Sequence, residues 1–268
     1  MTLNSLRTFL RVRLYTAISL MVDIADTTES RSSPQFSINR SSSSHLRALA
    51  LAEIPLQRLS GTNPIRYRSA IALQLASKAK VRPQEFAMNL CDAYDTLETS
   101  LGSSVRFSIE TNATGWLTLS LSCTDLMVFL DQSLSHESNR SPIPPHYFPF
   151  LIWQTHQRCQ SLRSHLIFYL ENDLAQDVSE PDRPPDRQYD SIRSAFSTLI
   201  ESLLDWMDDK GHSKTPQKAL IHVCQCLDRL HQQVPLFHPH TSPQTQRQFL
   251  RSLAWVQGAI QYEATLNK

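Results

Sequence analysis

The chain has 268 residues, with 26 Lys and Arg against 25 Asp and Glu and a formal net charge of +1. This length allows one large or two modest domains with a real core, and the balanced charge excludes a bulk attraction to nucleic acid or anionic membrane. The five glycines are scattered singly, so neither a dinucleotide-binding fingerprint nor a P-loop can be written. Five cysteines without a Cys-x-x-Cys pair are typical of reduced thiols in the cytoplasm.

The first 45 residues combine an apolar periodicity with a serine-rich segment. Apolar residues recur at three- and four-residue steps over 3–24, which predicts an amphipathic helix. Arginines interrupt this stretch, so we expect no membrane span. Residues 27–44 hold too little apolar surface to offset the entropy of ordering, which predicts a flexible loop. The Arg- and Ser-rich start is also compatible with an organelle targeting segment, an alternative that the acidic residues at 23, 26 and 29 disfavour.

Residues 46–134 alternate between helical and strand patterns. A proline is favoured in the first turn of a helix, and apolar residues at helical spacing follow Pro83. Strict alternation of apolar and polar residues farther on is typical of strands with one buried face. In chain order, the predicted elements are an edge strand at 54–59, a helix over 69–80, a helix from Pro83 with Phe86, Ala87, Leu90, Ala93, Tyr94 and Leu97 buried, strands at 105–110 and 116–121, and a helix over 125–134.

Prolines cluster over 138–147 and predict a linker between two domains. Everything beyond it has helical periodicity, which indicates a bundle packed through apolar stripes. The predicted helices cover 151–174, 192–211, 216–234 and 244–266. We therefore expect an α+β chain, with a small α/β domain and its antiparallel sheet over 1–137 and an all-helical domain over 148–268.

Several residues of the first domain follow a recognisable pattern. A Tyr-containing turn leads into an Ala-x-x-Leu-Ala helix, and Pro-x-x-x-Ala opens the next helix; the matching residues are Tyr67, Ala72, Leu75, Ala76, Pro83 and Ala87. A Gly-aromatic pair follows at Gly115 and Trp116. This pattern resembles the N-terminal tRNA-binding domain of arginyl-tRNA synthetases, although the family's Asn near the last strand is replaced here by Thr118. The resemblance implies contact with the outer corner of a tRNA.

The second domain opens on a helix with a similar likeness. Gln154, His156, Arg158 and Ser161 resemble the first helix of the DALR-type anticodon-binding domain of the same synthetases. Two small alanines of the family pattern are Thr155 and Gln157 here, and the last basic residue, Arg163, comes one place early. Only the Pro-rich segment separates the two likenesses, where the synthetases insert a whole nucleotide-binding catalytic domain.

The chemistry of those enzymes is missing from the chain. Neither His-x-Gly-His nor Lys-Met-Ser-Lys occurs, and aminoacyl transfer needs such groups to stabilise developing phosphate charge. We therefore expect a protein that is not an enzyme, with no catalytic residues and no nucleotide or other cofactor. The metal-ligand types His222, Cys224, Cys226 and His231 have no zinc spacing, so we expect buried thiols and no metal site.

A run of basic residues between 54 and 84 contains no acid, and guanidinium groups bind phosphate bidentately and stack on bases. The alternatives are a solvated helix face for the charges and a core position for the aromatic residues. The candidate tRNA-binding residues are Arg66, Tyr67, Arg68, Lys78, Lys80, Arg82 and Trp116 in the first domain, with Gln154, His156, Arg158 and Arg163 in the second.

The two function hypotheses differ in class. The first is a cytoplasmic, non-catalytic protein that binds tRNA, with arginine-accepting tRNA among the candidates. The second is a protein-interaction or assembly factor that reuses the fold without binding RNA, as the balanced charge and the acid-rich stretch 173–190 favour. Steep salt dependence of tRNA binding distinguishes them, because phosphate contacts release counterions.

Overall fold

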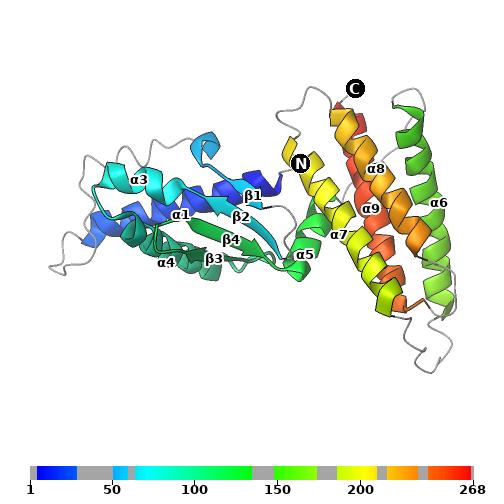
Figure 1. Ribbon diagram of the computed structural model, residues 1–268, viewed down its shortest axis with the longest axis horizontal. Coiled ribbons are helices and arrows are strands. Elements are labelled where there is room, and N and C mark those ends of the chain that lie inside the picture. Colours follow the sequence, from blue (N-terminus) through cyan, green and yellow to red (C-terminus); the bar gives the residue numbers. More distant parts are fainter. Residues whose placement is uncertain are drawn as a thin grey trace. The chain divides into compact units, whose positions relative to one another are not determined.

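The computed structural model describes residues 5–28, 51–59, 64–134, 148–173, 186–209, 216–234 and 241–266 (Figure 1). It confirms the α+β class, because an antiparallel sheet with helices comes first and the residues described from 148 on are mostly helical. The chain divides into two compact units, here called the sheet unit (6–129) and the helical unit (from 130 on). The division falls inside α5 (Cys123–Leu134), whereas the predicted linker at 138–147 lies outside the described residues.

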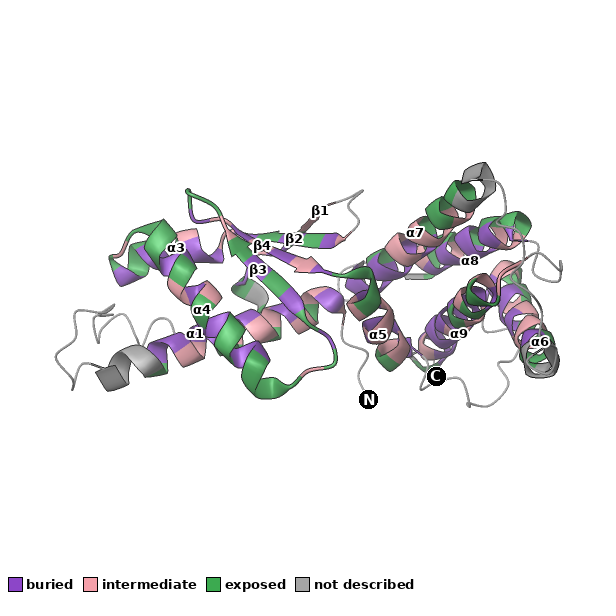
Figure 2. Cartoon of the chain, turned by 90° about the horizontal axis from the view of Figure 1, so that it is seen from below, coloured by how far each residue is buried: buried purple, intermediate pink, exposed green. Residues whose placement is uncertain are grey.

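The sheet unit is a four-stranded antiparallel sheet in the order β1-β2-β4-β3. Figure 2 shows α1 and α4 on the same side of this sheet. The stripe predicted for α4, from Phe86 to Leu97, is buried throughout and is therefore confirmed. Besides α5, the elements are α1 (Leu6–Thr28), a short 3-10 helix (Leu51–Glu53), β1 (Gln57–Leu59), β2 (Ile65–Ser69), α3 (Ile71–Ala79), α4 (Pro83–Leu101), β3 (Phe107–Thr111) and β4 (Leu117–Leu121).

The sequence did not predict β2, although it is a central strand that pairs with both β1 and β4. The helix expected from residue 69 begins only at Ile71, because Ser69 ends the strand: its hydroxyl donates to the Pro55 carbonyl at 2.7 Å. The edge strand is confirmed in a shorter form, as β1. The flexible loop predicted for 27–44 is wrong at Thr27 and Thr28, which end α1; its remainder lies outside the described residues.

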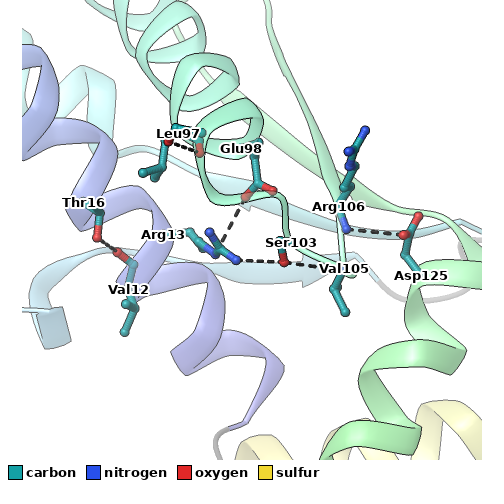
Figure 3. A network of polar contacts seen from close by, with 10 residues as sticks. Val12, Arg13, Thr16, Leu97, Glu98, Ser103, Val105, Arg106 and Asp125 are labelled. Atoms are coloured by element: carbon teal, nitrogen blue, oxygen red, sulfur yellow. Dashed lines mark hydrogen bonds and ion pairs between the residues drawn. The ribbon is translucent and has the colours of Figure 1, made fainter.

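A polar network fastens α1 to the end of α4 (Figure 3). The Arg13 guanidinium donates to the Ser103 hydroxyl at 3.0 Å and lies 3.7 Å from the Glu98 carboxylate. Burial raises the pKa of the Glu98 carboxyl above its ordinary value, and the charge of Arg13 opposes part of that rise. The same guanidinium lies 5.0 Å from the centre of the Phe9 ring. The N-terminal helix is thus an integral layer of the sheet unit.

The helical unit contains α6 (Phe150–Asp173), α7 (Asp186–Asp209), α8 (Pro216–Gln233) and α9 (Pro243–Leu266), as the periodicity predicts. α7 packs along α8, and α6 packs along α9. The last turn of α5 also belongs to this unit: the Trp255 indole donates to Asp131 at 2.7 Å, and a Cβ on Gly258 would lie 2.0 Å from the Leu134 carbonyl oxygen. Within the described residues, no helix combines the length and apolarity that a membrane span requires.

Candidate nucleic-acid interface

The two faces of the sheet differ in the side chains that they carry. Successive strand residues point to opposite faces, and directly paired residues share one face. The face toward the helices holds buried side chains such as Ile65, Tyr67 and Leu119. The opposite face, which we call the open sheet face, is exposed or half-buried and comprises Gln57, Leu59, Arg66, Arg68, Ser108, Glu110, Thr118 and Ser120, with Trp116 immediately before β4.

Arg68 and Trp116 lie together at one end of this face, where β4 begins. The guanidinium carbon of Arg68 lies 5.2 Å from the centre of the Trp116 ring, within the range of a cation–π contact. Arg68 is exposed and Trp116 is half-buried, so both offer surface to a ligand. Arg66 lies two residues along β2, beside Ser120 on β4. The face therefore combines a half-buried aromatic ring with two guanidinium groups and a row of small hydroxyls.

The β3–β4 turn brings Trp116 close to the start of α4. Gly115 has a φ of +86°, and a Cβ there would lie 2.9 Å from atoms of Pro83, so only glycine allows this close approach. Pro83 begins α4, and the exposed residues Lys80 and Arg82 directly precede it. The turn thus positions the aromatic ring at the same end of the sheet unit as the basic α3–α4 connection.

Lys80 adopts a left-handed conformation, with φ +57°, at the end of α3. Glycine is the usual residue there, because a side chain in this region costs roughly 1 kcal/mol. Lys78, also exposed, lies in the last turn of the same helix. The four basic residues Arg66, Arg68, Lys80 and Arg82 are all exposed, as an interface with phosphates requires.

Sequence reasoning missed Arg106, which is exposed and directly precedes β3. It lies outside the acid-free window of residues 54–84. Its alternation with the apolar residues Val105 and Phe107 nevertheless indicated that its side chain lies on the side of the sheet opposite the core. Its backbone N–H donates to Asp125 at 3.3 Å.

Tyr67 is a correction to the predicted site. Its side chain is fully buried in the middle of β2, on the face that the helices cover, so it cannot stack on a base. The interpretation as a core aromatic residue is the right one here. Its neighbours Arg66 and Arg68 point the other way because side chains alternate along a strand.

Three of the four residues predicted in the helical unit are buried in it or bonded within it. His156 is fully buried, and burial lowers its pKa, which rules out a direct contact with RNA. The Arg158 guanidinium donates to Asp228 at 2.6 Å and also contacts the His231 ring nitrogen. Arg163 donates to the side-chain oxygen of Gln257 at 2.5 Å. Of this group, only Gln154 is exposed.

The His and Cys side chains of α8 contact other protein groups within the helical unit. His222 lies 3.7 Å from the Cys226 sulfur, which also contacts the Ser202 hydroxyl at 3.2 Å. Burial raises the pKa of the Cys224 thiol to about 12. Among the described residues, no three His, Cys, Asp or Glu side chains are grouped to hold an ion.

Comparison with models of protein families gives no match, and neither curated proteins nor solved structures give one.

Proposed function

We propose that this protein is a non-catalytic tRNA-binding protein and that the open sheet face is its RNA contact. The observation that carries the proposal is the Arg68–Trp116 pair on a sheet face lined by Arg66, Thr118 and Ser120. Unpaired bases stack on aromatic rings and guanidinium planes, and arginine binds phosphate. A flat sheet is a suitable platform for such nucleotides, because single-stranded RNA presents its bases for stacking.

The resemblance of Gly115, Trp116, Pro83 and their surroundings to arginyl-tRNA synthetases supports tRNA as the RNA. The absence of the synthetase signature motifs supports binding without aminoacylation and without a nucleotide cofactor. The cytoplasm is the proposed location, because all five cysteines are unpaired and three of them are buried.

A tRNA titration at several salt concentrations tests the proposal. If Arg66, Arg68, Lys80 and Arg82 each neutralise a phosphate, the logarithm of the affinity falls with the logarithm of salt with a slope of about −3. The variant R66E/R68E should make this slope less negative by more than one unit. The control R193E/R229E makes the same charge change at exposed positions of α7 and α8 and should leave the slope unchanged.

A protein-interaction role is the second candidate, and the helical unit favours it. Its Arg158 and Arg163 have partners within the bundle, while Phe150 at the start of α6 is 70% exposed. Aromatic residues are enriched at protein–protein interfaces relative to the rest of the surface. Absence of tRNA binding even at 50 mM salt would reject the first function and favour this one.

A further inference from the structure

The open sheet face contains a single acidic residue among its described members, Glu110 on β3. It pairs directly with Thr118 on β4, and Thr118 pairs in turn with Arg68 on β2. Glu110 and Arg68 therefore lie in one row, two strand spacings or about 10 Å apart. In the part of the chain that the structure describes, no ion pair involves Glu110.

This arrangement of charges separates the expected positions of the phosphates and the bases of a bound RNA strand. Arg66 and Arg68 attract phosphates to β2, and the exposed basic residues Lys80 and Arg82 extend the positive charge beyond α3. The Glu110 carboxylate repels phosphate from the end of β3 that pairs with Thr118, whereas the exposed Arg106 precedes the other end of that strand. Phosphates are therefore expected over β2, with a base directed past Trp116 toward β3.

The chemistry of a carboxylate restricts which base fits at that point. An ionised carboxylate only accepts hydrogen bonds, through two oxygens. The Watson–Crick edge of guanine offers two adjacent donors, N1–H and the 2-amino group. Adenine and cytosine place an acceptor nitrogen beside their amino group, and uracil places carbonyl oxygens on both sides of its N–H. These acceptor atoms would be repelled by a carboxylate oxygen, so guanine alone can donate hydrogen bonds to both oxygens of the carboxylate.

We infer that Glu110 is a specificity-determining residue that selects a guanine stacked on Trp116. The inference rests on the proposed RNA-binding function and adds to it the identity of the preferred base. A bidentate pair of this kind discriminates against the wrong base by on the order of 10-fold or more in affinity.

The test measures the affinity of the full-length protein for the RNA pentamers UUGUU, UUAUU and UUUUU, and for a pentamer with inosine at the centre. UUGUU should bind on the order of 10-fold more tightly than UUAUU; because adenine is also a purine, stacking alone cannot account for this difference. Inosine lacks the 2-amino group and should fall between the two.

Two variants locate the effect. E110Q replaces one acceptor oxygen by a donor and should abolish the guanine preference without weakening the binding of UUUUU. E85Q removes the same charge from another exposed acid, in the first turn of α4 beside the basic connection, and should keep the preference. Equal binding of all pentamers by the wild type, or a preference that survives in E110Q, would overturn the assignment of Glu110 and leave RNA binding intact. Absence of binding to tRNA and to every pentamer at low salt would overturn both.

Discussion

The arginines of β2 and the arginines of α6 have opposite surroundings, although the sequence predicted both groups as candidate tRNA contacts. Arg66 and Arg68 are exposed on a sheet face, and Arg68 makes a cation–π contact with Trp116. Arg158 and Arg163 donate to Asp228 and Gln257 within the helical unit. A basic residue in a motif is thus a candidate for RNA contact only where the fold leaves its charge without a protein partner.

The largest effect is expected from Tyr67, the candidate aromatic residue that lies in the core. Tyr67→Ala removes a fully buried side chain and should lower the free energy of unfolding by about 3–5 kcal/mol. Trp116→Ala removes a half-buried ring and should cost far less stability while weakening RNA binding. Urea denaturation of both variants, with tRNA titration of Trp116→Ala, measures this contrast. Equal loss of stability in the two variants would contradict it.

Arg158→Ala should lower the free energy of unfolding by up to about 1 kcal/mol, because it removes the ion pair with Asp228, which water can still reach. The same change should leave the salt dependence of tRNA binding as it is. Arg68→Ala is the matched variant in the sheet unit: little change in stability is expected, together with weaker binding. A lower salt slope in Arg158→Ala would show that the helical unit also contacts phosphate.

Acid should destabilise the helical unit through His156. Burial lowers the pKa of this imidazole in the folded state, so the unfolded chain binds a proton more readily. Stability from this source is fully present above the ordinary histidine pKa of about 6.5 and is lost as the pH falls below it. The variant His156→Leu should show a smaller loss between pH 7 and 5, measured by thermal unfolding.

The control for this experiment is His165→Gln, which changes an exposed histidine of the same helix and should keep the pH dependence of the wild type. Part of the dependence should remain in His156→Leu, because burial and the charge of Arg158 also lower the pKa of His231. A wild-type pH profile in His156→Leu would contradict the prediction.

The smallest effect is expected at Lys80, where stability and binding should change in opposite directions. Lys80→Gly relieves the left-handed backbone and should raise the free energy of unfolding by up to about 1 kcal/mol. It also removes a proposed phosphate contact, so tRNA affinity should fall several-fold. Lys80→Ala is the matched control, with the same loss of charge but no gain in stability. Unchanged affinity in both variants would remove Lys80 from the interface.

Local sequence patterns were sufficient for most elements. Phe86, Leu90 and Leu97 recur at helical spacing behind Pro83, and α4 buries these residues. The alternation that predicted β3 and β4 is equally local. β2 escaped prediction because its inward positions hold only two apolar residues, Ile65 and Tyr67, followed by Ser69. Its pairing with β4 joins positions some fifty residues apart, which no local pattern indicates.

The sequence by itself determined the fold class, the basic window around Arg66 and the helical stripes. These features can be recognised from residues that are close together in the chain. Only the tertiary structure decided which of these residues can meet a ligand. Pairing of β2 with β4 directs Tyr67 inward and Arg68 outward, and packing of α6 on α8 brings Arg158 to Asp228, 70 positions away. Such long-range contacts decide whether a side chain is exposed and whether its charge is paired, and no local sequence pattern predicts them.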